Sequence, residues 1–259
     1  MQFRARVPKQ RAIRRILALR PGSTPAQAVK IARHRIDSDL FRLWDDLLLP
    51  LPSYAQRLQC TGIEEIQYLD QALAAGNGVI LLTLHFGANR PALKHLATLG
   101  YPTLSLQDQT SRNPRQGRLG RVLRKRYIEF LRRSYPDVVY VQDPECSLKI
   151  LRRLRSGGLV HMNLDVLNVK TAVEGAFLGV SWRFPVGVFD LVRLSGCAVV
   201  PMLCLTRSAG FQIRFDPMLD VVRAASRDEF VHANLPAFTG VFERQIAAHP
   251  EQWRPWTWR

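Results

Sequence analysis

Short, nearly continuous apolar runs alternate along the chain with stretches in which apolar residues recur every three or four positions. The helical spacing over 21–49 predicts an amphipathic helix that starts near Ser23 or Thr24. Further helices are expected over 64–75, 91–99, 146–155, 184–194 and 228–248. The apolar runs are typical of strands buried on both faces, and they cover 79–84, 103–106, 138–141, 159–164, 197–205 and 210–215.

The order of these elements indicates the fold class. Strands that alternate with helices favour an α/β protein with a central, mainly parallel sheet flanked by helices. With 259 residues and 47% apolar content, the chain can bury one large core. No repeat or low-complexity linker divides it, so residues 1–259 are expected to form a single domain, with residues 1–60 as a helical N-terminal arm within it.

Positive charge dominates the composition. Lysine and arginine number 37 against 21 acidic residues, which gives a net charge of +16, and the excess gathers in segments 1–21 and 112–133. On a helix starting near Pro114, the second segment would carry basic residues on one side and apolar residues on another. Such a surface suits an acidic carrier protein or anionic lipid headgroups. Nucleic acid is the least favoured partner, because the sequence has neither a zinc-finger pattern nor an aromatic-rich RNA-binding signature.

Export signals and metal patterns are not seen in the sequence. No apolar run approaches the roughly 20 residues that span a bilayer. The basic start is not followed by a long apolar stretch, so it is not typical of a signal peptide. The four cysteines, Cys60, Cys146, Cys197 and Cys204, lack metal-ligand spacing and are typical of reduced thiols in an intracellular protein. We therefore expect a cytoplasmic protein that needs no metal and no cofactor.

The candidate chemistry begins in the stretch GVILLTLHFGANRPAL, residues 78–93, where an apolar strand ends just before His85. Ligands of open α/β sheets bind beyond the carboxyl ends of the strands, and histidine is suited to general base catalysis near neutral pH. The N–H groups of the turn around Gly87 could hold an oxyanion. The alternative is a partly buried histidine with a structural role only.

Four segments support the catalytic interpretation by resemblance: GNGVILLTLHFGANRPAL, LKILRRLRSGGLVHMNLDV, VEGAFLGVSWRFPVGVFDLVRLSGCAVVPM and IAAHPEQWRPWTWR. In this order they resemble the lysophospholipid acyltransferase superfamily, specifically its late lipid A (lauroyl/myristoyl) acyltransferase branch, over essentially the whole chain. The resemblance implies that a histidine deprotonates an acceptor hydroxyl or amine. The acceptor then attacks an acyl thioester on acyl carrier protein or coenzyme A.

The N-terminal segment RAIRRILALRPGSTPAQAVKIARHRI resembles the part of that branch that follows its membrane anchor. The anchor itself is not seen in this sequence. If the acceptor is a lipid, we expect the basic arm to hold the protein peripherally at the inner face of the membrane. Attachment of this kind would weaken as salt is added.

The sequence departs from the branch within this motif and near the Asn-Pro pair that follows it. The branch reads His-Phe-Gly-Asn-Trp-Glu; His85 and Gly87 match it, whereas Asn89 replaces the tryptophan and Arg90 replaces the carboxylate. The branch also places an arginine near a following Asn-Pro pair, where the resemblance implies that it faces an anionic acceptor, and Arg112 is the candidate for that role here. Gly87, Asn89, Arg90 and Arg112 are accordingly the predicted oxyanion and substrate-binding residues.

The missing motif carboxylate leaves three interpretations open. A cation at Arg90 could keep the imidazole of His85 neutral. Another carboxylate could orient the imidazole instead: Asp165 is the first candidate, because it follows a strand of the same parallel sheet, and Glu174 is the second. Alternatively, acyl transfer is lost and the fold is a non-catalytic module that binds a carrier protein or lipid.

Other chemically interesting side chains are assigned to the core. His161 lies within a strand, which favours a structural role over catalysis. The aromatic residues Phe177, Phe184 and Phe189 could line an acyl groove, but core packing is the favoured interpretation. The tryptophans at the end of the chain, Trp253, Trp256 and Trp258, are expected to pack it against the domain, with a membrane-interface role as the alternative.

Overall fold

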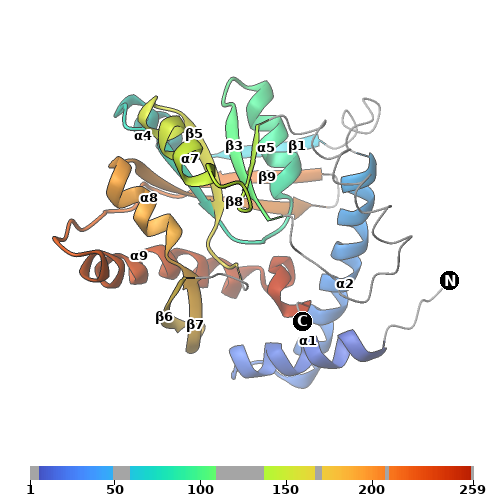
Figure 1. The fold of residues 1–259 in the computed structure, drawn as a ribbon. Helices are drawn as coiled ribbons and strands as arrows, with labels where there is room; N and C mark the ends of the chain where they lie inside the picture. Colours follow the sequence, from blue (N-terminus) through green and yellow to red (C-terminus); the bar gives the residue numbers. More distant parts are fainter. Residues whose placement is uncertain (1–5, 49–58, 109–136, 167–170, 208–209, 258–259) are drawn as a thin grey trace.

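The computed structural model describes residues 6–48, 59–108, 137–166, 171–207 and 210–257 (Figure 1). The helices are α1 (Arg6–Leu19), α2 (Pro25–Leu48), α4 (Gln67–Ala74), α5 (Asn89–Thr98), α7 (Cys146–Arg155), α8 (Gly187–Ser195), α9 (Arg227–Ala248) and the 3-10 turns η1 (Pro250–Gln252) and η2 (Arg254–Thr257). The strands are β1 (Gln59–Glu64), β2 (Val79–Thr83), β3 (Thr103–Gln107), β4 (Val138–Tyr140), β5 (Leu159–Asn163), β6 (Ala172–Phe177), β7 (Val180–Pro185), β8 (Ala198–Arg207) and β9 (Gly210–Phe215).

A seven-stranded sheet forms the centre of the protein, in the order β1-β9-β8-β2-β5-β3-β4. The five strands from β8 to β4 are parallel to their neighbours, β9 runs antiparallel to β8, and β1 is parallel to β9. The α/β class and the mainly parallel sheet predicted from the sequence are confirmed. Strands β6 and β7 form a separate antiparallel hairpin.

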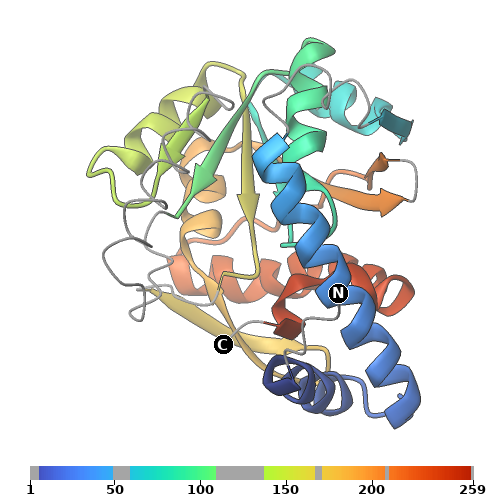
Figure 2. The same ribbon diagram turned by 90° about the vertical axis from the view of Figure 1, so that its right-hand side faces the viewer.

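Helices cover both faces of the sheet because side chains of a strand alternate between its two sides. On β2, Val79 and Leu81 pack in a cluster with apolar side chains of α4 and α5. Ile80 and Leu82 pack in a second, larger cluster with side chains of α7, α8 and α9. Figures 1 and 2 show the sheet between these two helical layers.

The first two helices pack against the C-terminal turns. Helices α1 and α2 of the N-terminal arm lie beside the C-terminal turns η1 and η2 (Figure 1). The guanidinium of Arg15 donates to the carbonyl of Pro255 (2.5 Å), and that of Arg35 donates to the carbonyl of Gln252 (2.9 Å). Arg35 is buried, so this contact is part of the packed interior. Within the described ranges, no helix is both long and apolar enough to cross a bilayer.

Several boundaries differ from those predicted. The helix expected over 21–49 is α2, which the Thr24 hydroxyl caps by accepting from the Gln27 N–H (3.2 Å), and α1 precedes it. Strands β1, β6 and β7 were missing from the prediction.

The helix predicted from Phe184 instead starts at Gly187, because Phe184 precedes Pro185 and a residue before proline favours extended backbone. The predicted basic helix over 112–133 lies outside the described residues.

Candidate active site

The candidate site forms where two adjacent parallel strands end. The register of β2 and β5 pairs Thr83 with Asn163. His85 and Asp165 each follow two residues later, and the ladder continues between them with the Leu164 N–H donating to the Thr83 carbonyl (2.8 Å). Because paired positions on adjacent strands lie about 5 Å apart, this register alone brings the two side chains together.

Asp165 binds both the backbone and the side chain of His85. Its Oδ1 lies 2.7 Å from the imidazole Nδ1, and the His85 backbone N–H donates to Oδ1 (2.9 Å) and Oδ2 (3.0 Å). A carboxylate only accepts hydrogen bonds, so Nδ1 carries a proton, and in the neutral imidazole Nε2 then has the lone pair. Asp165 is fully buried, whereas the His85 side chain is 24% exposed. This is the arrangement of a general base with its orienting carboxylate.

The second carboxylate predicted from the sequence, Glu174, lies elsewhere. It is an exposed residue of β6, and its carboxylate accepts a hydrogen bond from the Ser181 hydroxyl across the β6–β7 hairpin (3.3 Å). Of the two candidates, the structure therefore places Asp165 against the imidazole.

The turn after His85 requires glycine at position 87. Gly87 has φ = 50°, and a Cβ there would lie 1.8 Å from the carbonyl oxygen of Cys204. Its N–H donates to the Gln252 carbonyl (3.1 Å), and the next N–H, of Ala88, donates to the Cys204 carbonyl (3.1 Å). Both donors are therefore used within the protein in this conformation, and the assignment of these amides to an oxyanion stays a prediction.

Asn89 holds the same turn from the other side. Its side-chain NH₂ donates to the Leu84 carbonyl (2.7 Å) and to Oδ1 of Asn163 (3.3 Å), so both hydrogens are engaged within the protein. We therefore assign Asn89 to the turn rather than to substrate. Arg90 is partly buried in the first turn of α5. Arg112 lies outside the described residues.

A buried chain of polar groups lies beneath the site. The Thr83 hydroxyl donates to Oδ1 of Asn163 (2.8 Å) and so accepts from Nε2 of His161 (2.9 Å). The Nδ1 of His161 then accepts from the Ser105 hydroxyl (3.2 Å). Burial, with a smaller effect from the nearby charge of His85, lowers the pKa of His161 to about 3. His161 is thus a neutral, buried side chain, as the structural interpretation predicted.

Trp253 is the site residue that the sequence did not reveal. Its indole Nε1–H donates to Oδ2 of Asp165 (2.9 Å), and its side chain is 0% exposed. Trp253 and Trp256 are buried inside the protein, as predicted, and their burial rules out the alternative role at a membrane interface for these two side chains. Trp258 lies outside the described residues. Asp165 and Trp253 are 88 residues apart, and no local pattern links them.

Comparison with known proteins assigns the family. Residues 44–258 match the family model of the bacterial lipid A biosynthesis acyltransferases. The chain belongs to this acyltransferase family. The matched range contains every residue of the site described above, from Thr83 to Trp253, whereas α1 and most of the N-terminal arm precede it.

Two curated relatives of this acyltransferase-family chain are phosphatidylinositol mannoside acyltransferases of Mycobacterium tuberculosis, from strains CDC 1551 / Oshkosh and ATCC 25618 / H37Rv. Each is 28% identical over 194 residues, which is 73% of this chain and 56% of the relative. The chain thus spans about half the length of the curated relatives it matches.

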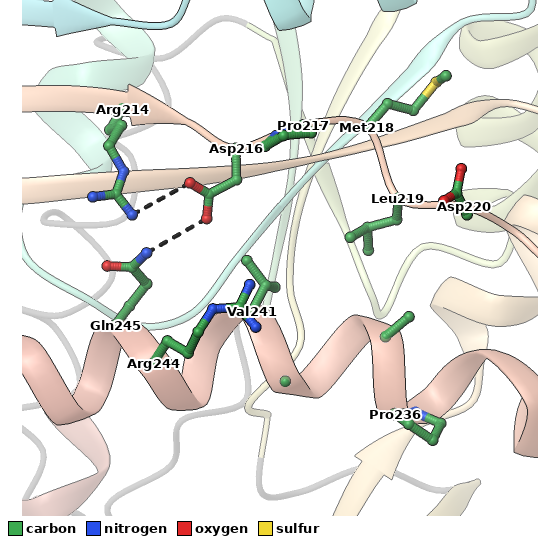
Figure 3. Close-up of a pocket in the computed structure, with 12 residues that line it drawn as sticks. Arg214, Asp216, Pro217, Met218, Leu219, Asp220, Pro236, Val241, Arg244 and Gln245 are labelled. Atoms are coloured by element: carbon green, nitrogen blue, oxygen red, sulfur yellow. Dashed lines mark hydrogen bonds and ion pairs between the residues drawn. The ribbon is translucent and has the colours of Figure 1, made fainter.

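A separate cleft of about 510 Å³ lies between α9 and the loop after β9 (Figure 3). An ion pair between Arg214 and Asp216 (3.3 Å) and a hydrogen bond from Gln245 to Asp216 (3.4 Å) form one end of it. Residues of β9, α9 and their connection line this cleft, so it is distinct from the family's motif at the ends of β2 and β5.

Proposed function

We propose that this protein transfers an acyl group from an acyl thioester to a hydroxyl or amine of a lipid acceptor, with His85 as the general base. The observation that supports this most strongly is the 2.7 Å contact between the His85 Nδ1 and Asp165. It supplies the orienting carboxylate that the motif itself lacks at Arg90. Membership of an acyltransferase family supports the same reaction.

In the proposed reaction, His85 accepts one proton from the acceptor and later gives it to the leaving thiolate. The Nε2 of His85 takes the proton of the acceptor O–H or N–H as the acceptor atom attacks the thioester carbonyl carbon. The tetrahedral intermediate then collapses, the carbon–sulfur bond breaks, and the imidazolium returns the proton to the leaving thiolate. The products are an ester or amide and a free thiol. Asp165 stabilises the imidazolium between the two steps.

The two buried cysteines of the described residues, Cys197 and Cys204, do not favour an acyl-enzyme route. The Cys204 thiol is fully buried, and burial raises its pKa. Burial raises the pKa of the Cys197 thiol in the same way. Because the thiolate is the nucleophilic form, direct attack by the acceptor is the simpler proposal.

Arginines would balance the negative charges in this scheme. We propose that Arg90, with the N-terminus of α5, stabilises the oxyanion, because positive charge at a helix N-terminus favours a developing anion. Arg112 is proposed to face an anionic group of the acceptor or donor.

The donor is proposed to be acyl carrier protein or coenzyme A, and no metal or further cofactor is invoked. The acceptor is proposed to be a phosphate-bearing lipid with free hydroxyls, in keeping with the names of the family and of the mycobacterial relatives. With a net charge of +16, the protein is proposed to work peripherally at an anionic, cytoplasmic membrane surface. Co-sedimentation with vesicles containing anionic lipid, lost as salt is raised, tests this placement.

The test of the activity is the variant H85A. Wild type and variant are incubated with lauroyl, myristoyl and palmitoyl thioesters of coenzyme A and of acyl carrier protein, with phosphatidylinositol mannoside and lipid A precursors as acceptors. Mass spectrometry then detects acylated product. H232A is the matched control, because His232 is exposed on α9.

We expect product from the wild type and from H232A, and a loss of at least about 10³-fold in H85A with donor binding retained. Binding of donor or lipid by the wild type without product from any pair would contradict the proposal. That result would favour the alternative, a non-catalytic module that binds a carrier protein or lipid.

A further inference from the structure

We infer that Trp253 is a positioning residue that fixes the orientation of Asp165 and, through it, the proton on His85; the inference rests on the proposed function. The indole Nε1–H donates to Oδ2 of Asp165 (2.9 Å), while Nδ1 of His85 bonds to the other oxygen, Oδ1 (2.7 Å). The carboxylate is therefore held between the two rings.

Hydrogen bonds must set the orientation of this carboxylate, because the last torsion of an aspartate side chain has only broad preferences. The His85 backbone N–H lies at 2.9 Å from Oδ1 and 3.0 Å from Oδ2, so it does not distinguish the two oxygens. The indole of Trp253 is a donor to Oδ2 alone. It thus favours the rotation in which Oδ1 faces Nδ1 of His85.

The backbone of Trp253 pairs directly with the backbone of the motif that carries His85. Trp253 forms an antiparallel bridge with Phe86. On either side of that bridge, the Arg254 N–H donates to the His85 carbonyl (2.9 Å) and the Gly87 N–H donates to the Gln252 carbonyl (3.1 Å). The indole donor and the histidine whose proton it controls are consequently fixed relative to each other.

Contacts from two other parts of the chain, and one within the segment itself, hold this C-terminal segment in place. The Gln252 side chain bonds both the N–H (3.1 Å) and the carbonyl (3.2 Å) of Thr206, at the end of β8. Arg35 of α2 donates to the Gln252 carbonyl (2.9 Å). The indole of Trp253 packs edge-to-face on that of Trp256, with 4.6 Å between ring centroids. Trp253 is therefore a rigid donor.

Loss of the indole N–H should change proton chemistry rather than substrate binding. Asp165 would keep more of its negative charge toward His85, which favours the imidazolium and moves the acid limb of the pH–rate profile to higher pH. The carboxylate could also turn, which would allow the tautomer with the proton on Nε2. Since Trp253 is fully buried, KM should change little.

The test compares W253F with W256F. Trp256 is the matched control: phenylalanine there keeps an aromatic ring against Trp253, and the indole N–H that is lost donates to the Pro250 carbonyl (2.6 Å) instead of to Asp165. Long-range ¹⁵N–¹H spectra of the His85 imidazole report which nitrogen carries the proton, independently of turnover. Benzothienylalanine at position 253, in which sulfur replaces the indole N–H, makes the same test without loss of volume.

We expect Nδ1-protonated His85 in the wild type and in W256F, and a mixture of tautomers in W253F and in the benzothienylalanine protein. The same two proteins should lose about 10- to 100-fold in kcat with KM within about twofold, and their acid limb should rise by about half a pH unit or more. An unchanged tautomer in the benzothienylalanine protein would overturn the inference. If the wild type shows no turnover, the proposed function fails and the tautomer still decides the role of Trp253.

Discussion

The buried His161 beneath the site should make the free energy of unfolding depend on pH by a predictable amount. His161 has its pKa lowered from 6.5 to about 3, chiefly by burial. Above pH 6.5 the histidine is neutral in both the folded and the unfolded chain, so the neutral form stabilises the fold fully there. As the pH falls from 6.5 toward 3, the unfolded chain binds a proton that the folded protein does not, and stability is lost.

The size of this loss follows from the two pKa values. Each pH unit within that window costs about 1.4 kcal/mol. Between pH 7.5 and pH 5.0 the free energy of unfolding should fall by about 2 kcal/mol on account of His161 alone.

Urea unfolding of wild type and H161Q at pH 7.5, 6.5, 5.8 and 5.0 measures this term. The contributions of all other groups cancel in the difference between the two proteins. H161Q should be less stable at pH 7.5, because it disturbs the bonds to Thr83 and Ser105. Between pH 7.5 and pH 5.0, the free energy of unfolding of H161Q should fall by about 2 kcal/mol less than that of the wild type. This difference corresponds to about 0.7–1 M in the urea midpoint. Parallel pH dependences of the two proteins would refute the reasoning.

Three further predictions concern the motif and its partners. D165N should lower kcat about 10³- to 10⁴-fold in the acyl-transfer assay, because an amide cannot hold the Nδ1 proton and the indole N–H together; a loss under tenfold would contradict this. G87A should destabilise the protein by about 3 kcal/mol or more in urea unfolding, because of its positive φ and the Cys204 carbonyl; a near-normal midpoint would refute the strain. E174Q should have a kcat within twofold of the wild-type value, whereas a large loss would show that Glu174 takes part in the active site.

Much of the site could be predicted because its signals are local. An apolar run followed by a polar residue marks the end of a buried strand, and this pattern places His85 and Asp165 at the same edge of a parallel sheet. The carboxylate missing at Arg90 could therefore be sought on a neighbouring strand. The structural role of His161 followed in the same way from its place inside an apolar strand.

The β6–β7 hairpin was missed because its turn has an unusual sequence. Its two-residue loop is Leu178-Gly179, and both residues have positive φ, 52° and 78°. The usual signal for such a turn is Asn-Gly or Asp-Gly, and leucine seldom takes this conformation. Tertiary pairing, rather than local preference, sets the backbone there.

The part played by Trp253 was out of reach for a different reason. Its hydrogen bond to Asp165 depends on the bridge to Phe86 and on contacts from the N-terminal arm, each of which joins distant parts of the sequence. The same contacts use the N–H groups of Gly87 and Ala88, which the sequence had assigned to an oxyanion. The pattern around the motif indicates a turn, but not which carbonyls its donors meet.

The central claim is that His85 and Asp165 act as one acid–base unit, and a double-mutant cycle on kcat tests it most directly. H85A, D165N and H85A/D165N are compared with the wild type under saturating donor and acceptor. Residues that act as a unit give non-additive losses, so the double variant should be no slower than H85A within about threefold. Losses that multiply across the two sites would contradict the claim, because the two side chains would then contribute independently.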